Sequence, residues 1–154
     1  MTAPGDVVAM RAALHEARRA LESGDVPVGA IVLDATGSVI GRGHNARERD
    51  GDPTAHAELV AVRRAARTVG EWRLGGCTLV VTLEPCTMCA GAIVLSRLER
   101  LVFGAFDPRA GAVGSLWDVV RDRRLNHRPE VVGGVLAEEC SGLLDDFFAH
   151  QRLG

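Results

Sequence analysis

Two short motifs, His56-Ala57-Glu58 and Pro85-Cys86-Thr87-Met88-Cys89, constrain the fold of this chain more than any other feature. Each stands where a helix is expected to begin, because Asp52-Pro53 precedes the first motif and Pro85 suits the first position of a second helix. Cys86 and Cys89 are three residues apart and share one helix face, so both sulfurs can reach one ion. The fold must therefore bring two helix N-termini together.

His56, Cys86 and Cys89 form a ligand set typical of zinc. One imidazole and two thiolates suit Zn²⁺, and three protein ligands leave a fourth position for water, as in catalytic sites. The positive end of a helix favours thiolates. Bound Zn²⁺ lowers the pKa of its water to roughly 7, and the unligated carboxylate of Glu58 could take the proton of that water. The pattern predicts hydrolysis.

Each motif alone has a simpler interpretation. Cys-x-x-Cys could be a redox pair or half of a structural zinc site, and His-Ala-Glu could be an ordinary helix start. Residues two apart on a helix diverge, so His56 and Glu58 can converge only in the first turn or through a bridging water. The motifs together favour a catalytic zinc site. Cys77 and Cys140 lack partners at ligand spacing and are expected to be buried thiols.

The spacing of apolar residues predicts an α/β fold. Helices are expected from Asp6 to Gly24, from Thr54 to Thr68, from Cys86 to Ser96 and at the C-terminus, and strands over Val28–Asp34, Val39–Asn45, Cys77–Leu83, Leu101–Ala105 and Pro129–Leu136. The first two strands should form an antiparallel hairpin, and later strands should pair in parallel across connecting helices. A three-layer α/β/α sandwich around a mixed central sheet follows, with the site at one end of the sheet.

Length and composition favour one domain over residues 1–154, since 154 residues that are 47% hydrophobic can bury one substantial core. We expect a soluble cytoplasmic protein without a membrane segment, because the sequence contains no leader pattern and no apolar run of spanning length. A net charge of −2 alone favours a small-molecule enzyme. However, all 18 basic residues are arginines, several of them clustered, and some could bind phosphate.

Longer sequence blocks resemble the bacterial tRNA adenosine deaminases, the wobble-editing branch of the cytidine deaminase-like superfamily. His-Ala-Glu and Pro-Cys-x-x-Cys mark the superfamily only. The blocks that point to the tRNA branch are 25–30, 52–58, 82–92 and 111–116, together with Asn126-His127-Arg128 and the segment 143–148. The likeness runs nearly from end to end.

This resemblance implies a zinc-dependent, hydrolytic conversion of adenosine to inosine at the wobble position of a tRNA anticodon stem-loop, with an arginine tRNA as the expected substrate. It implies zinc at His56, Cys86 and Cys89, and proton transfer by Glu58. It also implies a homodimer, for which the apolar helix at 86–96 is a plausible interface element. An anticodon adenosine is already unpaired, so its extrusion costs less than flipping a duplex base.

Three substrate contacts are implied by the resemblance alone: Asn45 with the flipped purine, Asp107 with a neighbouring anticodon nucleotide, and Val28 as a wall for the base. From the residues alone, Asn45 could be a turn residue, Asp107 a loop start and Val28 part of the core.

Two other functions are consistent with the motifs. The first is deamination of a free nucleobase or nucleoside, such as guanine or cytosine, with the same metal centre and a different pocket. The second is a non-catalytic RNA-binding module in which zinc supports folding and Glu58 has no role.

Overall fold

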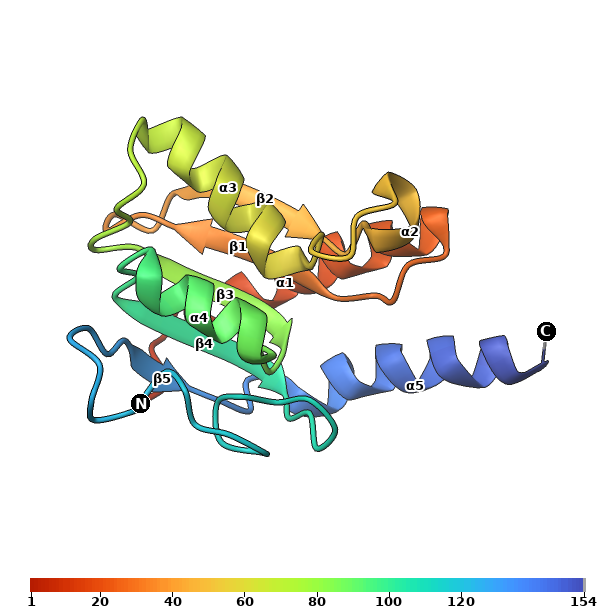
Figure 1. Ribbon diagram of the computed structural model, residues 1–154. Coiled ribbons are helices and arrows are strands. Elements are labelled where there is room, and N and C mark those ends of the chain that lie inside the picture. Colours follow the sequence, from red (N-terminus) through yellow and green to blue (C-terminus); the bar gives the residue numbers. More distant parts are fainter. Residues whose placement is uncertain (154) are drawn as a thin grey trace.

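The computed structural model describes residues 1–153, whose strands form one five-stranded sheet in the order β2-β1-β3-β4-β5 (Figure 1). The strands are β1 (Gly29–Leu33), β2 (Val39–His44), β3 (Thr78–Leu83), β4 (Arg100–Ala105) and β5 (Glu130–Val132). β1 pairs with β2 as an antiparallel hairpin and pairs antiparallel with β3, whereas β3, β4 and β5 run parallel. The predicted mixed sheet is therefore confirmed, although β5 is shorter than the segment expected from the sequence.

Helices cover both faces of the sheet, and the predicted three-layer α/β/α arrangement is confirmed. They are α1 (Asp6–Arg19), which continues as the 3-10 turn η1 (Ala20–Ser23), and α2 (Arg47–Asp50), α3 (Ala57–Val69), α4 (Thr87–Leu95) and α5 (Ala137–Leu153). α3 and α4 lie on one face, and α1 and α5 lie on the other (Figure 1).

Each face has its own apolar core because the central strands are buried on both sides and alternate side chains between them. Leu79 and Val81 of β3 pack with α3 and α4, whereas Val80 of the same strand packs with α1 and α5. Cys77 and Cys140 are buried as expected, with exposed fractions of 4% and 1%.

α3 lies unusually close to the hairpin because glycines face it. A Cβ atom added to Gly43 of β2 would lie 2.6 Å from the carbonyl oxygen of Ala57 and 2.7 Å from the amide nitrogen of Ala61. Real Cβ contacts are longer, so only glycine permits this backbone approach. The approach sets the height of α3 above the sheet.

A partly buried ion pair joins α1 to the sheet. The Arg100 guanidinium of β4 donates to both carboxylate oxygens of Asp6 at 2.6 and 2.8 Å, and this hydrogen-bonded contact lowers the pKa of Asp6 despite burial. Asp6 is the first residue of α1 and does not cap it through its side chain. Within residues 1–153, none of the helices is long and apolar enough to cross a membrane.

Candidate metal centre and active site

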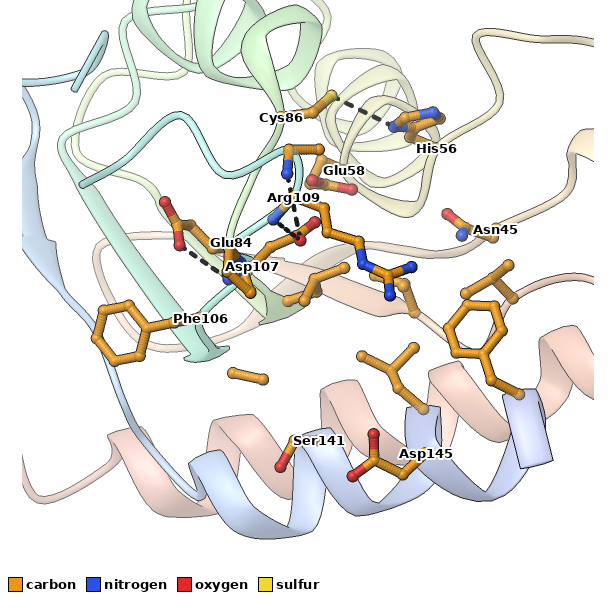
Figure 2. A pocket seen from close by; sticks show the side chains of 18 of the residues that line it. Asn45, His56, Glu58, Glu84, Cys86, Phe106, Asp107, Arg109, Ser141 and Asp145 are labelled. Carbon is orange, nitrogen blue, oxygen red and sulfur yellow. Dashed lines mark hydrogen bonds between the residues drawn. The ribbon is translucent and has the colours of Figure 1, made fainter. Parts of the chain in front are cut away.

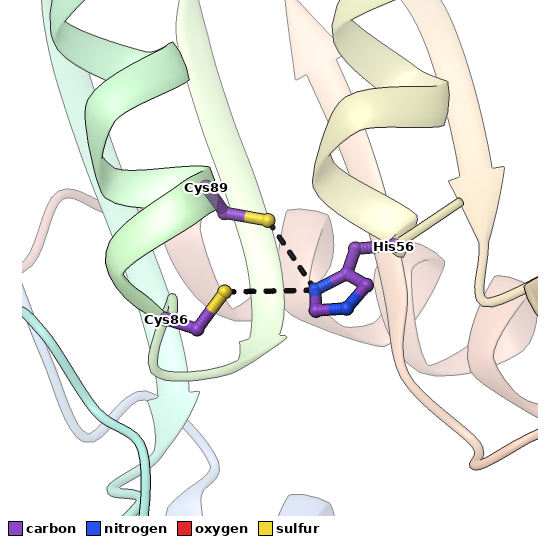
Figure 3. Close-up of side chains that lie close together, drawn as sticks. All are labelled: His56, Cys86 and Cys89. Carbon is purple, nitrogen blue, oxygen red and sulfur yellow. Dashed lines mark hydrogen bonds between the residues drawn. The ribbon is translucent and has the colours of Figure 1, made fainter. Parts of the chain in front are cut away.

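Two helix N-termini supply the candidate metal ligands. His56 is the N-cap of α3, Cys86 is the N-cap of α4, and Cys89 lies in the first turn of α4. α4 follows β3 after three residues, so the cysteines lie at the carboxyl end of that strand. Pro85 was expected at the first position of the helix, but it stands just before the N-cap because Cys86 is extended, with φ −76° and ψ 178°. This shift leaves both sulfurs directed toward His56 (Figure 3).

The separations of the three ligand atoms fit one zinc ion. Nδ1 of His56 lies 3.6 Å from Sγ of Cys86 and 3.5 Å from Sγ of Cys89, and all three atoms lie within 4.8 Å of one another. Tetrahedral Zn²⁺, with Zn–S bonds of about 2.3 Å and Zn–N bonds of about 2.0 Å, separates sulfur from nitrogen by roughly 3.5 Å. The residues present therefore match the donor set and the spacing that zinc requires.

The two thiols differ in acidity. The pKa of Cys86 falls to about 3 because Cys89 and His56 donate hydrogen bonds to its sulfur. The pKa of Cys89 rises because it hydrogen-bonds to Cys86 and is buried. Hydrogen bonding to Cys86 also raises the pKa of His56. A thiolate held beside an imidazole attracts a divalent cation.

Glu58 lies in the first turn of α3, two residues after His56, where the sequence required it to be for the two side chains to share a site. Its side chain faces the same pocket as His56 and Cys86 (Figure 2). Only 5% of the residue is exposed, and burial raises the pKa of its carboxyl group to about 7. A carboxyl group with such a pKa can both accept and release a proton near neutral pH.

The pocket that contains these groups has a volume of about 770 Å³. Val28, Asn45 and Asp107, the three residues that the family resemblance assigned to substrate, all line it. Val28 is also 4% exposed and belongs to the core, so it is both a wall and a packing residue.

Asn45 uses one end of its side chain to hold the metal-site helix. Its Oδ1 accepts a hydrogen bond from the backbone N–H of Ala57 at 2.9 Å. This contact satisfies an otherwise unpaired donor at the first turn of α3. The side-chain NH₂ group of the same amide is then available to a ligand in the pocket.

Asp107 lies in the loop that follows β4, and the start of this loop lines the pocket. Its Oδ1 accepts hydrogen bonds from the backbone N–H groups of Arg109 at 3.0 Å and Ala110 at 3.3 Å. The loop-start role that its sequence suggests is therefore present, and the same carboxylate lines the pocket.

Sequence reasoning missed two parts of the pocket. The first is α5, which contributes several side chains: Ser141, Leu144, Asp145, Phe148, Gln151 and Arg152. The apolar spacing of Leu144 and Phe148 was a usable signal for a helix but not for its position. The second is Glu84, whose place directly before Pro85-Cys86 was visible in the sequence without indicating what it binds.

Comparison with known proteins gives consistent matches. The family model for the cytidine and deoxycytidylate deaminase zinc-binding region matches residues 5–105. A tRNA-specific adenosine deaminase of Bacillus subtilis is 50% identical over 147 residues, which cover 96% of this chain and 91% of that protein. The corresponding protein of Haemophilus influenzae is 51% identical over 143 residues, covering 93% of this chain and 83% of its own length.

Solved structures extend the comparison to the fold. One from a study of A-to-I editing by tRNA:A34 deaminases at the wobble position superimposes with a TM-score of 0.85 and 43% identity, covering 89% of this chain and 99% of that one. A guanine deaminase from Nitrosomonas europaea gives a TM-score of 0.79 with 25% identity, covering 97% of this chain and 86% of that one.

Proposed function

This chain belongs to the cytidine and deoxycytidylate deaminase family and, within it, to the tRNA-specific adenosine deaminases, and from that premise we propose that it converts adenosine to inosine at the wobble position of a tRNA anticodon loop. The observation that carries the proposal is the joint placement of His56, Cys86, Cys89 and Glu58, with the ligand atoms spaced for zinc and the carboxyl group beside them in an open pocket.

We assign proton transfer to Glu58. Zinc bound by His56, Cys86 and Cys89 would supply an activated water at neutral pH. The Glu58 carboxylate takes a proton and delivers it to the purine ring nitrogen next to the carbon that carries the amine, which makes that carbon easier to attack. It then assists the departure of ammonia. Its buried position and its pKa of about 7 suit both directions of transfer.

We assign recognition of the base to Asn45 and Val28. The Asn45 side chain is fixed by the Ala57 N–H, so its free NH₂ group has a defined direction toward the pocket. Val28 offers an apolar surface to one side of the ring. Asp107, on the loop below, is the proposed contact for the nucleotide that neighbours the target.

The pocket supports a polynucleotide substrate better than a free base. At about 770 Å³ it exceeds the volume of a single purine ring, and three arginines line it: Arg47, Arg109 and Arg152. One guanidinium group can donate two hydrogen bonds to the oxygens of one phosphate, whereas a free base carries no phosphate. We further propose that the substrate is an arginine tRNA, as the family resemblance implies.

We propose a single domain over residues 1–154 that acts as a homodimer in the cytoplasm. Exposed apolar side chains support the dimer: Leu95 of α4 is 68% exposed, and Leu116 and Trp117, in the loop between β4 and β5, are 52% and 60% exposed. A reducing compartment suits a protein that needs Cys86 and Cys89 as metal ligands.

Deamination of free guanine is the alternative that a specific observation favours, because the Nitrosomonas europaea guanine deaminase shares the fold at a TM-score of 0.79. The higher identity of 50% to the Bacillus subtilis tRNA-specific enzyme supports the tRNA assignment.

The test is an incubation of the zinc-loaded protein with an arginine-tRNA anticodon stem-loop that carries adenosine at the wobble position, with inosine measured by mass spectrometry. We expect inosine at that position alone. Glu58→Ala should fold, keep zinc and lose turnover by roughly 10²-fold or more. A folded, zinc-loaded wild type that deaminates free guanine or cytosine and leaves the stem-loop unchanged would contradict the RNA assignment. Equal rates for wild type and Glu58→Ala would contradict the role of Glu58.

A further inference from the structure

A second buried carboxylate lies next to the metal-binding segment without facing the metal ligands. Glu84 follows β3 and directly precedes Pro85-Cys86, and only 2% of it is exposed. A buried carboxylate is costly unless hydrogen bonds replace its water. The identity of its donors therefore indicates what this carboxylate holds in place.

All of its hydrogen-bond donors come from one loop. Oε1 accepts the backbone N–H of Asp107 at 3.0 Å (Figure 2). Oε2 accepts the backbone N–H groups of Val113 and Ser115, each at 3.0 Å. The Ser115 hydroxyl also donates to Oε1. Four donors from the two ends of the segment 107–115 therefore converge on one side chain.

The segment is folded around the carboxylate. Gly111 lies so close to the Glu84 side chain that an added Cβ atom would overlap the carboxylate carbon. The Ala112 N–H donates to the carbonyl oxygen of Pro85 at 2.8 Å, so the loop is also bound to the residue before Cys86. Burial acts to raise the pKa of Glu84, but the hydrogen bonds from Ser115, Asp107 and Val113 lower it overall, which keeps the carboxylate ionised.

The same loop forms one wall of the pocket. Asp107, Pro108, Arg109 and Ala110 all line it. Asp107 is itself a donor to Glu84, and the other three lie between it and the next donor, Val113. One side chain thus connects the strand end that carries the metal ligand Cys86 to the wall that a substrate touches.

We propose that Glu84 is a positioning residue that fixes the wall 107–110 relative to the metal ligands and so sets the affinity for the nucleotides around the target adenosine. The inference rests on the proposed function for its substrate. The claim that Glu84 keeps the loop 107–115 ordered does not depend on the substrate and can be measured without one.

The test uses Glu84→Gln in the zinc-loaded full chain. The amide has almost the same volume, but one of its two polar atoms is a donor, so it cannot accept from all four loop donors. Hydrogen exchange of peptides covering 107–115 should be accelerated about tenfold or more, with the rest of the protein unchanged. Glu16→Gln is the matched control, because Glu16 is also 2% exposed and does not line the pocket.

Kinetics on the anticodon stem-loop provide the second measurement. We expect KM to rise about tenfold in Glu84→Gln while kcat changes less and zinc content stays the same. Ser115→Ala, which removes only one donor from Glu84, should change both measurements in the same direction by a smaller factor. It also provides the test if Glu84→Gln does not fold.

Unchanged exchange of the loop in the folded variants would overturn the inference, as would an unchanged KM beside an active wild type. Loss of zinc in parallel with activity would overturn it as well, because Glu84 would then support the metal ligands rather than the loop. A wild type that leaves the stem-loop unmodified would instead refute the proposed function. The hydrogen-exchange experiment would still show whether Glu84 holds the loop 107–115 in place.

Discussion

The two sides of the pocket are built differently. The inner wall, which consists of His56, Glu58 and Cys86, is carried by the first turns of two helices that pack on the core. The outer wall, which consists of the segment 106–110 and the pocket side of α5, is carried by a loop and by the exposed end of a helix. Glu58 is 5% exposed, whereas Phe106 of the outer wall is 57% exposed.

This difference separates two tasks. Groups that move protons or hold a metal must be fixed to within a fraction of an ångström, and secondary structure backed by a core provides that precision. Groups that bind a flexible RNA loop can be exposed and held by a few polar contacts. Changes in the inner wall should therefore alter metal content or kcat, and changes in the outer wall should alter KM.

The largest effect should follow from Cys86→Ala, which removes a ligand from the inner wall. The remaining pair of ligands holds zinc weakly, so metal and activity should be lost together. Atomic absorption and the inosine assay measure the two quantities. Cys77→Ala deletes a buried thiol away from the site and should retain the metal; zinc bound at full occupancy by Cys86→Ala would show that the ligand set is wrong.

Asn45→Asp should have the next largest effect. The carboxylate keeps an acceptor for the Ala57 N–H but has no NH₂ group to offer the base. We expect kcat/KM to fall about ten- to hundredfold, the cost of one unsatisfied polar contact, with zinc retained. A variant with normal kcat/KM would restrict Asn45 to the structural contact with α3.

Arg152→Gln tests the outer wall and should act on KM alone, by a factor of a few. If this guanidinium contacts a phosphate, the slope of log KM against log salt should decrease by about 0.7, the value for one contact with a single strand. Arg11→Gln is the control, since Arg11 pairs with Glu139 and does not line the pocket. A change in kcat with constant KM would contradict the claim that the outer wall acts on substrate binding alone.

The smallest effect concerns His44, the last residue of β2, which directly precedes Asn45 in the chain and does not line the pocket. It is 8% exposed, its Nδ1 has no hydrogen-bond partner, and burial lowers its pKa below 6.5, although the Glu16 charge opposes this and Arg49, Arg19 and Arg64 reinforce it. The unfolded chain therefore binds a proton at higher pH than the folded protein does.

The stabilising effect of a neutral His44 is therefore present above pH 6.5 and is lost as the pH falls from 6.5 through the lower pKa of the folded state. Denaturant unfolding of the zinc-loaded protein between pH 7 and pH 5 should show a smaller loss of stability in His44→Gln than in the wild type. If the free energy of unfolding changes with pH equally in the wild type and in His44→Gln, groups other than His44 cause the acid sensitivity of the protein.

The inner wall could be predicted from the sequence because its residues are close together within two motifs. His56 and Glu58 stand at the start of one helix, and Cys86 and Cys89 stand at the start of another, so spacing places each pair on one turn. Only the structure shows that His56 and Glu58 both face the pocket from the first turn of α3. The sheet was predictable for a similar reason, since buried strands appear as apolar runs.

The outer wall was only partly predictable because its contacts are long-range. Asp107 was found through family resemblance, and no local pattern indicates that Glu84 binds residues up to 31 positions away. The direction of α5 across the pocket depends on packing against β4 and β3 rather than on its own periodicity.

The close approach of Gly43 to α3 makes the sheet part of the metal site. The ligand His56 and the proton-transfer residue Glu58 lie at the start of α3, whereas the ligands Cys86 and Cys89 lie at the start of α4, so the spacing between the sheet and α3 affects the distance from His56 to both cysteines. A single methyl group on β2 would raise α3 and separate the ligands without touching any of them. Metal affinity in this protein can therefore be tuned from the hairpin, by residues that never contact metal or RNA.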